Sequence, residues 1–183
     1  MKNIDALVKD LVLNDDIAAK QRLANEIYEM AREKGIYLAS INELYKARGE
    51  GKCPGGWTVP AINLRNLTYY LARALFRVAN KNNSGAFIFE IAKSEMGYTG
   101  QPPVEYTGVI LAAAIKEGFV GPVFIQGDHC QINAKNYKAD PQKEIASIKH
   151  LLEDAIAAGF FNIDIDSSTV VNLDKKELSP GIN

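Results

Sequence analysis

The first part of the chain carries apolar side chains at helical intervals. Between residues 1 and 46 they recur three or four positions apart, which places them on one face of a helix. The Asn14-Asp15-Asp16 run predicts a break between two helices, because Asn and Asp favour the N-cap position. A further short helix is expected from Ser40, which forms a capping-box sequence with Glu43. The apolar positions are Ile4, Leu7, Val8, Leu11, Ile17, Leu23, Ile27, Met30 and Ala31.

A different pattern follows a loop dense in Gly and Pro, residues 48–56. Short apolar runs rich in β-branched and aromatic residues alternate with stretches of helical spacing. We therefore divide the chain into a helical segment with its loop, residues 1–56, and a β/α region, residues 57–183. The apolar runs predict strands over 57–64, 86–92, 122–126 and 161–165, and the stretches between them predict helices over 66–79, 104–117 and 141–158.

The strand runs are continuously apolar, which is typical of parallel strands covered on both faces. Two architectures compete, a doubly wound open sheet and a (β/α)8 barrel. Polar residues stand at the carboxyl end of all four predicted strands, and a barrel draws its chemistry from many strand ends, whereas an open sheet uses one switch point. No dinucleotide-binding glycine motif or P-loop is present. We therefore predict the N-terminal half of a TIM-type (β/α)8 barrel, about four βα units, preceded by helices.

The charge balance excludes some classes of function. The chain has 21 Lys and Arg against 22 Asp and Glu, a net charge of −1, so it lacks the basic surface of a nonspecific nucleic-acid binder. Its two cysteines are too few for a disulfide framework, and no apolar run is long enough for a signal peptide or a membrane span. We expect a cytoplasmic protein with no nucleic-acid or membrane partner.

The sharpest chemical signal is the segment FIQGDHCQ, in which a strand is expected to end and to present Asp128 and His129 at a loop. A neutral imidazole is the commonest metal ligand, and a neighbouring carboxylate can move a proton on a metal-held substrate. The alternative is structural, with Asp128 capping the next turn and His129 packing against a loop. The position at the carboxyl end of a parallel strand favours the functional interpretation.

Two carboxylates follow in the segment FNIDIDSS, where Asp164 and Asp166 share one face of the predicted strand. Burial of both would be costly unless they meet cations or hydrogen-bond donors. A structural interpretation leaves Asp164 at a partly exposed edge and uses Asp166 as a cap. We favour Asp166 as a carboxylate that faces a metal or supports its ligands.

Glu90 and Lys93 are charges within and just after an apolar strand run. They are expected either to form a buried ion pair that lines the barrel or to contact substrate. His150 lies in the middle of a predicted helix and is assigned no chemistry. Cys130 adjoins the Asp-His pair, but no second histidine nearby in the sequence would make a thiolate pair with it, so we do not expect a catalytic cysteine.

Five segments resemble the class II, zinc-dependent sugar-bisphosphate aldolases. They are PAIN (60–63), IFEIAKSE (88–95), GYTGQPP (97–103), QGDHC (126–130) and AGFFNIDIDSS (158–168). The Y-T-G-x-x-P and G-D-H motifs look closer still to the branch of tagatose-bisphosphate aldolase accessory subunits. The resemblance extends over residues 57–170 and does not include the N-terminal helices.

The resemblance implies reversible aldol cleavage of a phosphorylated sugar, fructose- or tagatose-1,6-bisphosphate, into dihydroxyacetone phosphate and glyceraldehyde 3-phosphate. By the same resemblance, His129 is a zinc ligand and Asp128 is the acid/base group on the aldehyde oxygen. Asn63 matches an active-site asparagine of the first barrel strand, and Asp166 matches a carboxylate near the metal. Zinc would act as a Lewis acid, without a Schiff base.

One departure from the family changes this picture. Its members take further zinc ligands, a Glu and two His, from strands five to eight, whereas this chain has only His129 and His150. A catalytic zinc uses about three protein ligands, and a full barrel needs on the order of 200 to 400 residues. We therefore expect the N-terminal portion of a longer protein, with residues 178–183 in a loop, and self-association into a homo-oligomer that covers open sheet edges. The alternatives are a noncatalytic aldolase-like subunit, an inactive fragment, or a phosphosugar-binding α/β protein.

Overall fold

Five parallel strands form one sheet in the computed structural model, which describes residues 3–171. β4 (Gly121–Gln131) is the longest strand and lies inside the sheet. On one side of β4 lies β3 (Ile88–Ala92), which in turn pairs with β2 (Ala61–Asn63). On the other side, β1 (Ile36–Leu38) pairs with the first residues of β4 and β5 (Asn162–Asp166) with its last.

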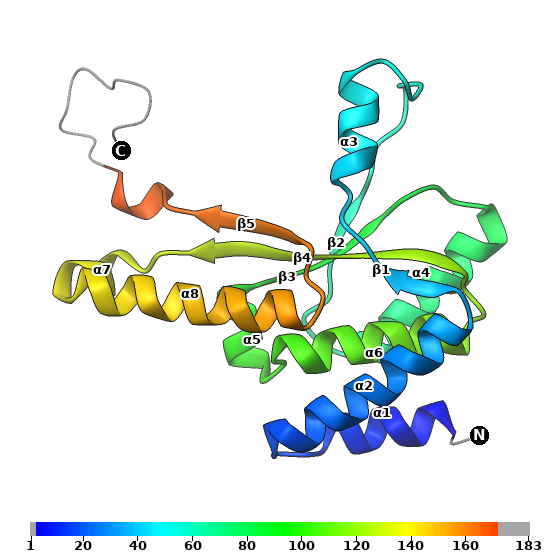
Figure 1. The fold of residues 1–183 in the computed structure, drawn as a ribbon, viewed down its shortest axis with the longest axis horizontal. Coiled ribbons are helices and arrows are strands. Elements are labelled where there is room, and N and C mark those ends of the chain that lie inside the picture. The colour runs from blue at the N-terminus through cyan, green and yellow to red at the C-terminus, as the bar shows by residue number, and fades with distance from the viewer. Residues whose placement is uncertain (1–2, 172–183) are drawn as a thin grey trace.

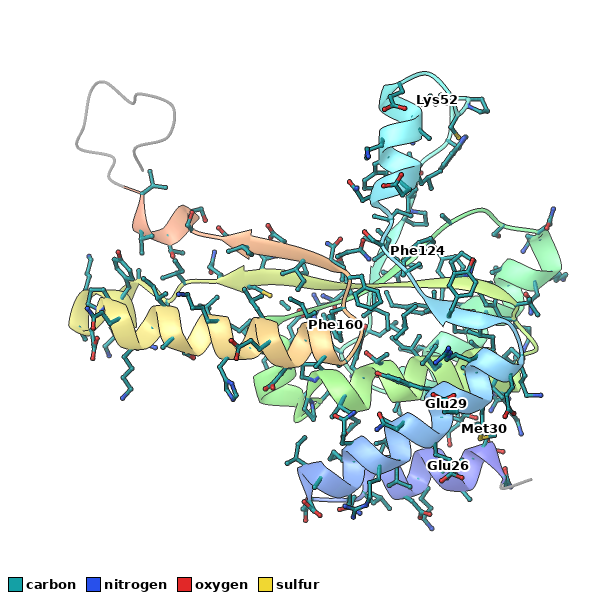
Figure 2. All side chains as sticks on the ribbon, viewed as in Figure 1. Glu26, Glu29, Met30, Lys52, Phe124 and Phe160 are labelled. Atoms are coloured by element: carbon teal, nitrogen blue, oxygen red, sulfur yellow. The ribbon has the colours of Figure 1, made fainter. Side chains whose placement is uncertain are left out.

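The helices of the described residues lie mostly on one side of this sheet (Figure 1). α4, α6 and α8 lie along one face, and α1 and α2 pack against α6. α3 projects from the opposite side of the sheet, and Lys52 lies at the tip of the segment that follows it (Figure 2). None of these helices is both long enough and apolar enough to cross a membrane. Their bounds are α1 (Ile4–Val12), α2 (Ile17–Glu33), α3 (Asn42–Gly49), α4 (Thr68–Asn82), α5 (Lys93–Thr99), α6 (Pro103–Lys116), α7 (Ala134–Ala139), α8 (Pro141–Ala157) and the 3-10 helix η1 (Ser168–Val170).

The structure confirms an α/β fold with a parallel sheet. It also confirms the alternation of strands and helices expected after Trp57, to which α5 and α7 add short helices in two connections. Residues 3–171 do not close into a barrel, because β2 pairs only with β3 and β5 only with β4 within this part of the chain. The loop expected over 178–183 lies outside the described residues.

Two expectations about strands are wrong. Ile36–Leu38, placed in the helical segment, is strand β1, because Gly35 ends α2 with a left-handed backbone (φ 74°) and the next residues pair with β4. Three residues are too few to show the alternation of a strand. β4 continues to Gln131 instead of ending at Gln126, because β5 pairs with this part of it.

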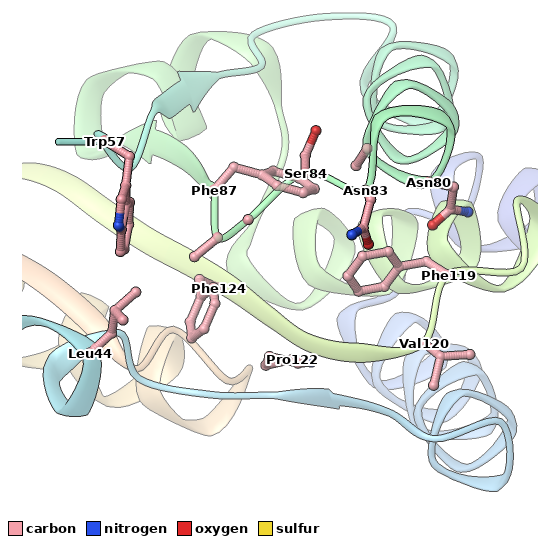
Figure 3. A pocket seen from close by; sticks show the side chains of 13 residues that line it. Leu44, Trp57, Asn80, Asn83, Ser84, Phe87, Phe119, Val120, Pro122 and Phe124 are labelled. Carbon is pink, nitrogen blue, oxygen red and sulfur yellow. The ribbon is translucent and has the colours of Figure 1, made fainter. Parts of the chain in front are cut away.

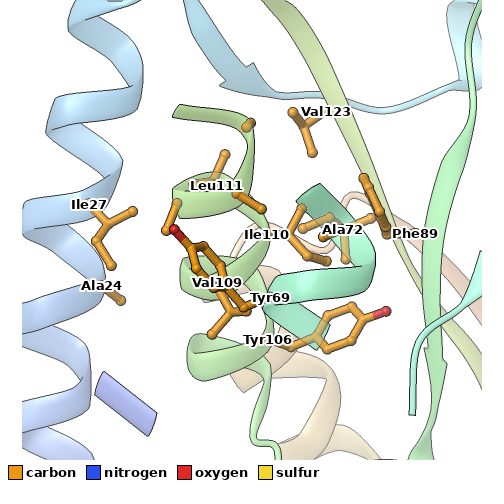
Figure 4. Packing of buried hydrophobic residues seen from close by; sticks show 14 of the residues in the cluster. Ala24, Ile27, Tyr69, Ala72, Phe89, Tyr106, Val109, Ile110, Leu111 and Val123 are labelled. Carbon is orange, nitrogen blue, oxygen red and sulfur yellow. The ribbon is translucent and has the colours of Figure 1, made fainter. Parts of the chain in front are cut away.

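Helix α6 is the centre of the hydrophobic core. Every residue from Pro103 to Ala114 is buried. Figure 4 shows its side chains among those of α2, α4 and the sheet. Gly108 allows α1 and α2 to approach α6 closely, since a Cβ at this position would lie 2.8 Å from Leu11 Cδ2 and 3.4 Å from Ala24 Cβ. The core therefore lies between the helices and one face of the sheet.

A buried ion pair joins the helices of this layer. Lys20 on α2 contacts Glu105 on α6, and the two side chains are only 9% and 6% exposed. The same ammonium donates to the carbonyl oxygens of Leu11 (3.0 Å) and Val12 (3.3 Å) at the end of α1. The pair thus connects three helices, and removal of one partner would leave the other charge buried without compensation.

Glu105→Gln should therefore lower the free energy of unfolding by about 3–5 kcal/mol. Urea unfolding followed by circular dichroism measures this change. Glu29→Gln serves as the control, because the ion pair between Glu29 and Arg32 is about 70% exposed on both sides and such pairs contribute about 0–1 kcal/mol. A loss in Glu105→Gln no larger than the loss in the control would contradict this role.

A second ion cluster joins α4 to the end of α6. The Glu117 carboxylate accepts hydrogen bonds from Arg77 at 3.0 and 3.1 Å and from Arg73 Nε at 2.6 Å. The two guanidinium groups lower the pKa of Glu117 from its ordinary value of 4.5 to about 2. The folded chain therefore binds this proton less readily than the unfolded chain.

Stability should depend on pH through Glu117. The stabilisation is fully present well above pH 4.5 and is lost as the pH falls through that value towards about 2. In Glu117→Gln, the free energy of unfolding should decrease less steeply as the pH falls over this range. Urea unfolding at a series of pH values measures this dependence. Glu153→Gln, exposed on α8, should keep the wild-type slope. An unchanged slope in Glu117→Gln would exclude the mechanism.

Candidate metal and substrate site

Polar side chains gather on the open face of the sheet, which we define as the face opposite helices α4, α6 and α8. The register aligns Asn63 with Glu90, Glu90 with Gln126, and Ala92 with Asp128. Aligned residues of neighbouring strands point to the same face, so this row crosses β2, β3 and β4. The residues that alternate with them are buried on the helix side; they are Phe89, Ile91, Val123 and Ile125.

A bulge changes the direction of β4 at Asp128 and His129. Between Gly127 and Cys130, three residue steps along β4 match two along β5, so β4 carries one extra residue. His129 accommodates it with a left-handed backbone, φ 44°. Cys130 returns to the helix side, where it is completely buried. Regular alternation would send Asp128 and His129 to opposite faces, and the bulge instead brings both towards β5.

Asp128, His129 and Asp164 form the candidate metal cluster. One nitrogen or oxygen atom from each lies within 4.8 Å of the other two. Asp128 Oδ2 is 2.8 Å from His129 Nδ1, and the His129 amide donates to Asp164 Oδ2 at 3.3 Å. An imidazole nitrogen and carboxylate oxygens are donor atoms that bind zinc and other divalent metals. The donor set therefore fits a divalent metal.

The charge of Asp128 acts directly on His129. The hydrogen bond that His129 donates to the Asp128 carboxylate, reinforced by the charge of Asp128, raises the pKa of His129 above its ordinary value. Contact with Nδ1 also orients the ring, as a carboxylate does for many metal-binding histidines. Asp128 is thus placed either to join the ligands or to hold the imidazole so that Nε2 faces a metal.

Asp166, the carboxylate that the sequence favours, lies outside this cluster. It accepts hydrogen bonds from Gln131 Nε2 at 2.6 Å and from the Ser168 amide at 2.8 Å. The hydrogen bonds from Ser168 lower the pKa of Asp166. These contacts join the carboxyl ends of β4 and β5 to η1. Asp164, two residues earlier on the same strand face, occupies the place next to His129.

Glu90 lies in the middle of the polar row. Gln126 Nε2 approaches its carboxylate at 3.3 Å. Burial, together with the negative charges of Asp128 and Glu95, raises the pKa of Glu90. Glu90 therefore keeps a proton at higher pH than an ordinary glutamate, which is a property of groups that carry protons in active sites.

Lys93 is turned towards α8 instead of Glu90. Its ammonium lies 3.1 Å from Glu144 and donates to the Gln131 carbonyl at 3.2 Å. Glu144 is 4% exposed and also accepts a hydrogen bond from the Asn133 amide at 2.9 Å. Lys93 thus has an ion pair, as the sequence allowed, but the partner is Glu144, which the sequence did not suggest.

Two residues that the sequence analysis does not single out complete the row at β2. Glu95 accepts hydrogen bonds from Asn63 Nδ2 at 2.6 Å and from Arg65 Nε at 2.5 Å. Arg65 and Glu95 are 30 residues apart, so no local pattern pairs them. The only available signal was their charge at the ends of apolar strand runs.

The amino end of the open face has a different character. A cavity of about 660 Å³ lies there between α3, the end of α4, the residues that precede β3 and the first residues of β4 (Figure 3). Leu44, Trp57, Phe87, Phe119 and Phe124 line it, and none of the expected site residues does. The polar chemistry of the open face is therefore concentrated at the carboxyl end of the strands.

Comparison of the chain with models of known protein families gives no match, and comparison with curated proteins gives none either.

Asp164→Asn and His129→Ala should each weaken Zn²⁺ binding by more than the ~10–100-fold typical of outer-shell substitutions, because each removes a direct ligand. Isothermal titration calorimetry with Zn²⁺ measures the affinity. Asp166→Asn should leave it unchanged, and His150→Ala on α8, 77% exposed, is the matched control. Loss of zinc in Asp166→Asn with retention in Asp164→Asn would reverse the assignment.

Proposed function

We propose that this chain provides the active site of a class II aldolase-like lyase, which cleaves a ketose bisphosphate reversibly with the help of a metal. The observation that carries the proposal is the convergence of Asp128, His129 and Asp164 at the carboxyl end of a parallel β/α sheet. Active sites of such folds lie at this end of the strands. The likeness of QGDHC and AGFFNIDIDSS to class II aldolase motifs supports the same reaction.

His129 and Asp164 would hold the metal in this proposal. When bound, a divalent ion such as zinc supplies Lewis-acid stabilisation of the negative charge that develops on the ketose oxygens. Asp128 supports this site by holding His129 Nδ1 at 2.8 Å, which fixes the orientation of the ring.

Asp128 also performs the proton transfer. Its carboxylate takes the proton from the hydroxyl group that becomes the aldehyde. As this oxygen forms its double bond to carbon, the adjacent carbon–carbon bond breaks and its electron pair stays with the ketone fragment. In the synthetic direction Asp128 returns the proton. Glu90, whose pKa is raised by burial and by the charge of Asp128, lies beside this group in the polar row.

Noncatalytic binding of a phosphorylated sugar is the second candidate, as a separate protein or as an accessory subunit. One observation favours it: within residues 3–171 the cluster contains a single histidine, and Lys93, which the sequence offered as a substrate contact, is already paired with Glu144. A binder of this kind retains affinity for the sugar phosphate without turnover.

The homo-oligomer expected from the sequence stays a prediction. In the described part of the chain, β2 and β5 each have one unpaired side. Unpaired strand edges favour association with another chain or cover by another element. This observation supports self-association and does not identify its geometry.

Asp128→Asn should lower the rate of fructose 1,6-bisphosphate cleavage by about 10²–10⁴-fold, because it removes the acid/base group. A coupled assay for the triose products measures the rate on zinc-loaded protein. Zinc affinity should fall by no more than the ~10–100-fold of an outer-shell substitution, which separates the proton-transfer role from direct ligation. Asp154→Asn on α8, 59% exposed, is the control. A wild-type rate in Asp128→Asn would remove Asp128 from the mechanism, and zinc-loaded wild-type protein without cleavage would favour the noncatalytic binder.

A further inference from the structure

Glu95 connects two side chains at the carboxyl end of β2. Its Oε2 accepts a hydrogen bond from Asn63 Nδ2 at 2.6 Å, and its Oε1 accepts one from Arg65 Nε at 2.5 Å. The Ala92 amide donates to Oε2 as well, at 2.9 Å, which ties the carboxylate to the end of β3. Glu95 is 8% exposed. A buried carboxylate with three donors has little freedom to move, so both partners are held in place.

The carboxylate determines which way the Asn63 amide points. An amide next to a carboxylate must direct its NH₂ group towards it, because its oxygen would be repelled. Asn63 Oδ1 therefore points away from Glu95. This oxygen is buried and has no hydrogen-bond partner among the described residues. A buried acceptor without a partner is costly, and a hydroxyl group from a ligand would satisfy it.

The same carboxylate holds Arg65 by one edge only. Of the five N–H donors of a guanidinium group, the one on Nε is engaged with Glu95. The Arg65 side chain is 55% exposed, and the Tyr98 hydroxyl interacts with it. The guanidinium group therefore keeps donors that can bind an anionic oxygen such as that of a phosphate.

The GYTGQPP motif, which the proposed reaction does not use, fixes the backbone at Arg65. Gln101 Nε2 donates to the Arg65 carbonyl at 2.9 Å, and Gln101 Oε1 accepts from Thr68 Oγ1 at 2.6 Å. Between these two anchors, Leu67 has a left-handed backbone with φ 48°. Both ends of the Gln101 amide thus hold the loop that follows β2 in one conformation.

We propose that Glu95 is a positioning residue that presents Asn63 Oδ1 and the Arg65 guanidinium together to a hydroxyl-bearing, anionic end of the substrate. The inference rests on the proposed function and specifies which part of the site takes the phosphorylated end. Neighbouring strands are about 4.8 Å apart and Asp128 lies two residues beyond the β4 residue aligned with Asn63, so Asn63 on β2 and Asp128 on β4 are separated by roughly 12 Å. The anionic end would lie at β2 while the reacting carbons lie at β4 and β5.

Calorimetric titration with fructose 1,6-bisphosphate, fructose and inorganic phosphate tests this assignment on the full chain. Arg65→Gln should weaken bisphosphate and phosphate binding about 10–100-fold, the range for loss of a charged hydrogen bond, and should leave zinc affinity unchanged. Arg77→Gln is the matched control, because Arg77 is 62% exposed and pairs with Glu117 on the helix side. Fructose, which has no phosphate group, should bind Arg65→Gln no better than it binds the Arg77→Gln control.

Glu95→Gln tests the positioning role. A glutamine at this place cannot accept from all three donors, so the Asn63 amide and Arg65 lose their fixed orientation. We expect KM for the bisphosphate to rise about tenfold or more with a smaller change in kcat. For inorganic phosphate, Glu95→Gln should add nothing to Arg65→Gln in the double variant, since Glu95 acts on phosphate through Arg65.

The outcomes separate this inference from the proposed function. Loss of phosphate binding in Arg65→Gln together with absence of turnover in wild type would sustain the anion site and reject the lyase. Turnover in wild type with unchanged bisphosphate and phosphate affinity in Arg65→Gln would overturn the anion site and keep the lyase. Additive effects in the double variant would overturn the positioning role of Glu95. Because the Arg65 side chain is 55% exposed, Arg65→Gln should stay folded. It therefore still tests the anion site if Glu95→Gln unfolds.

Discussion

Hydrogen bonding along both edges of β4 holds the sheet together and places the candidate site. β3 occupies one edge, while β1 and β5 share the other, so three of the other four strands pair with this single element. Because β4 runs from Gly121 to Gln131, it is long enough to pair with two strands along the same edge. The ladder between β4 and β5 contains the bulge at Gly127–Cys130, and that bulge brings Asp128 and His129 towards Asp164. The geometry of the candidate site thus follows from the way these two strands pair.

The two faces of the sheet differ in their packing and in their charged groups. The helix side contains the buried α6, the Lys20–Glu105 pair and the Glu117 cluster, so most of the stability is concentrated there. The open face has few apolar contacts at the carboxyl end of its strands and contains the charged groups instead. Charges on that face interact with each other: burial raises the pKa of Glu90 most, and the negative charges of Asp128 and Glu95 raise it further. Such interactions between like charges are tolerated because the packing on the other face holds the strands in place.

Much of the fold could be predicted from the sequence, whereas the site could be predicted only in part. The order of strands and helices after Trp57 follows from apolar runs and helical periodicity, and both depend on neighbours in the chain. Asp128 and His129 are adjacent in sequence, so their proximity was also predictable. The choice between Asp164 and Asp166 was not, because the two share a strand face and only the pairing partner distinguishes them. Asp166 meets Gln131, while Asp164 meets the bulge.

By itself, the sequence determined the α/β class, the parallel sheet, the absence of a strongly basic surface and the location of polar groups at strand ends. The tertiary structure alone decided that Ile36–Leu38 joins the sheet, that Lys93 pairs with Glu144, and that Glu95 holds Asn63 and Arg65. The physical reason is the range of the interactions. Periodicity and capping act between residues a few positions apart, whereas strand register, bulges and buried ion pairs join residues tens of positions apart, whose encounter depends on how the whole chain packs.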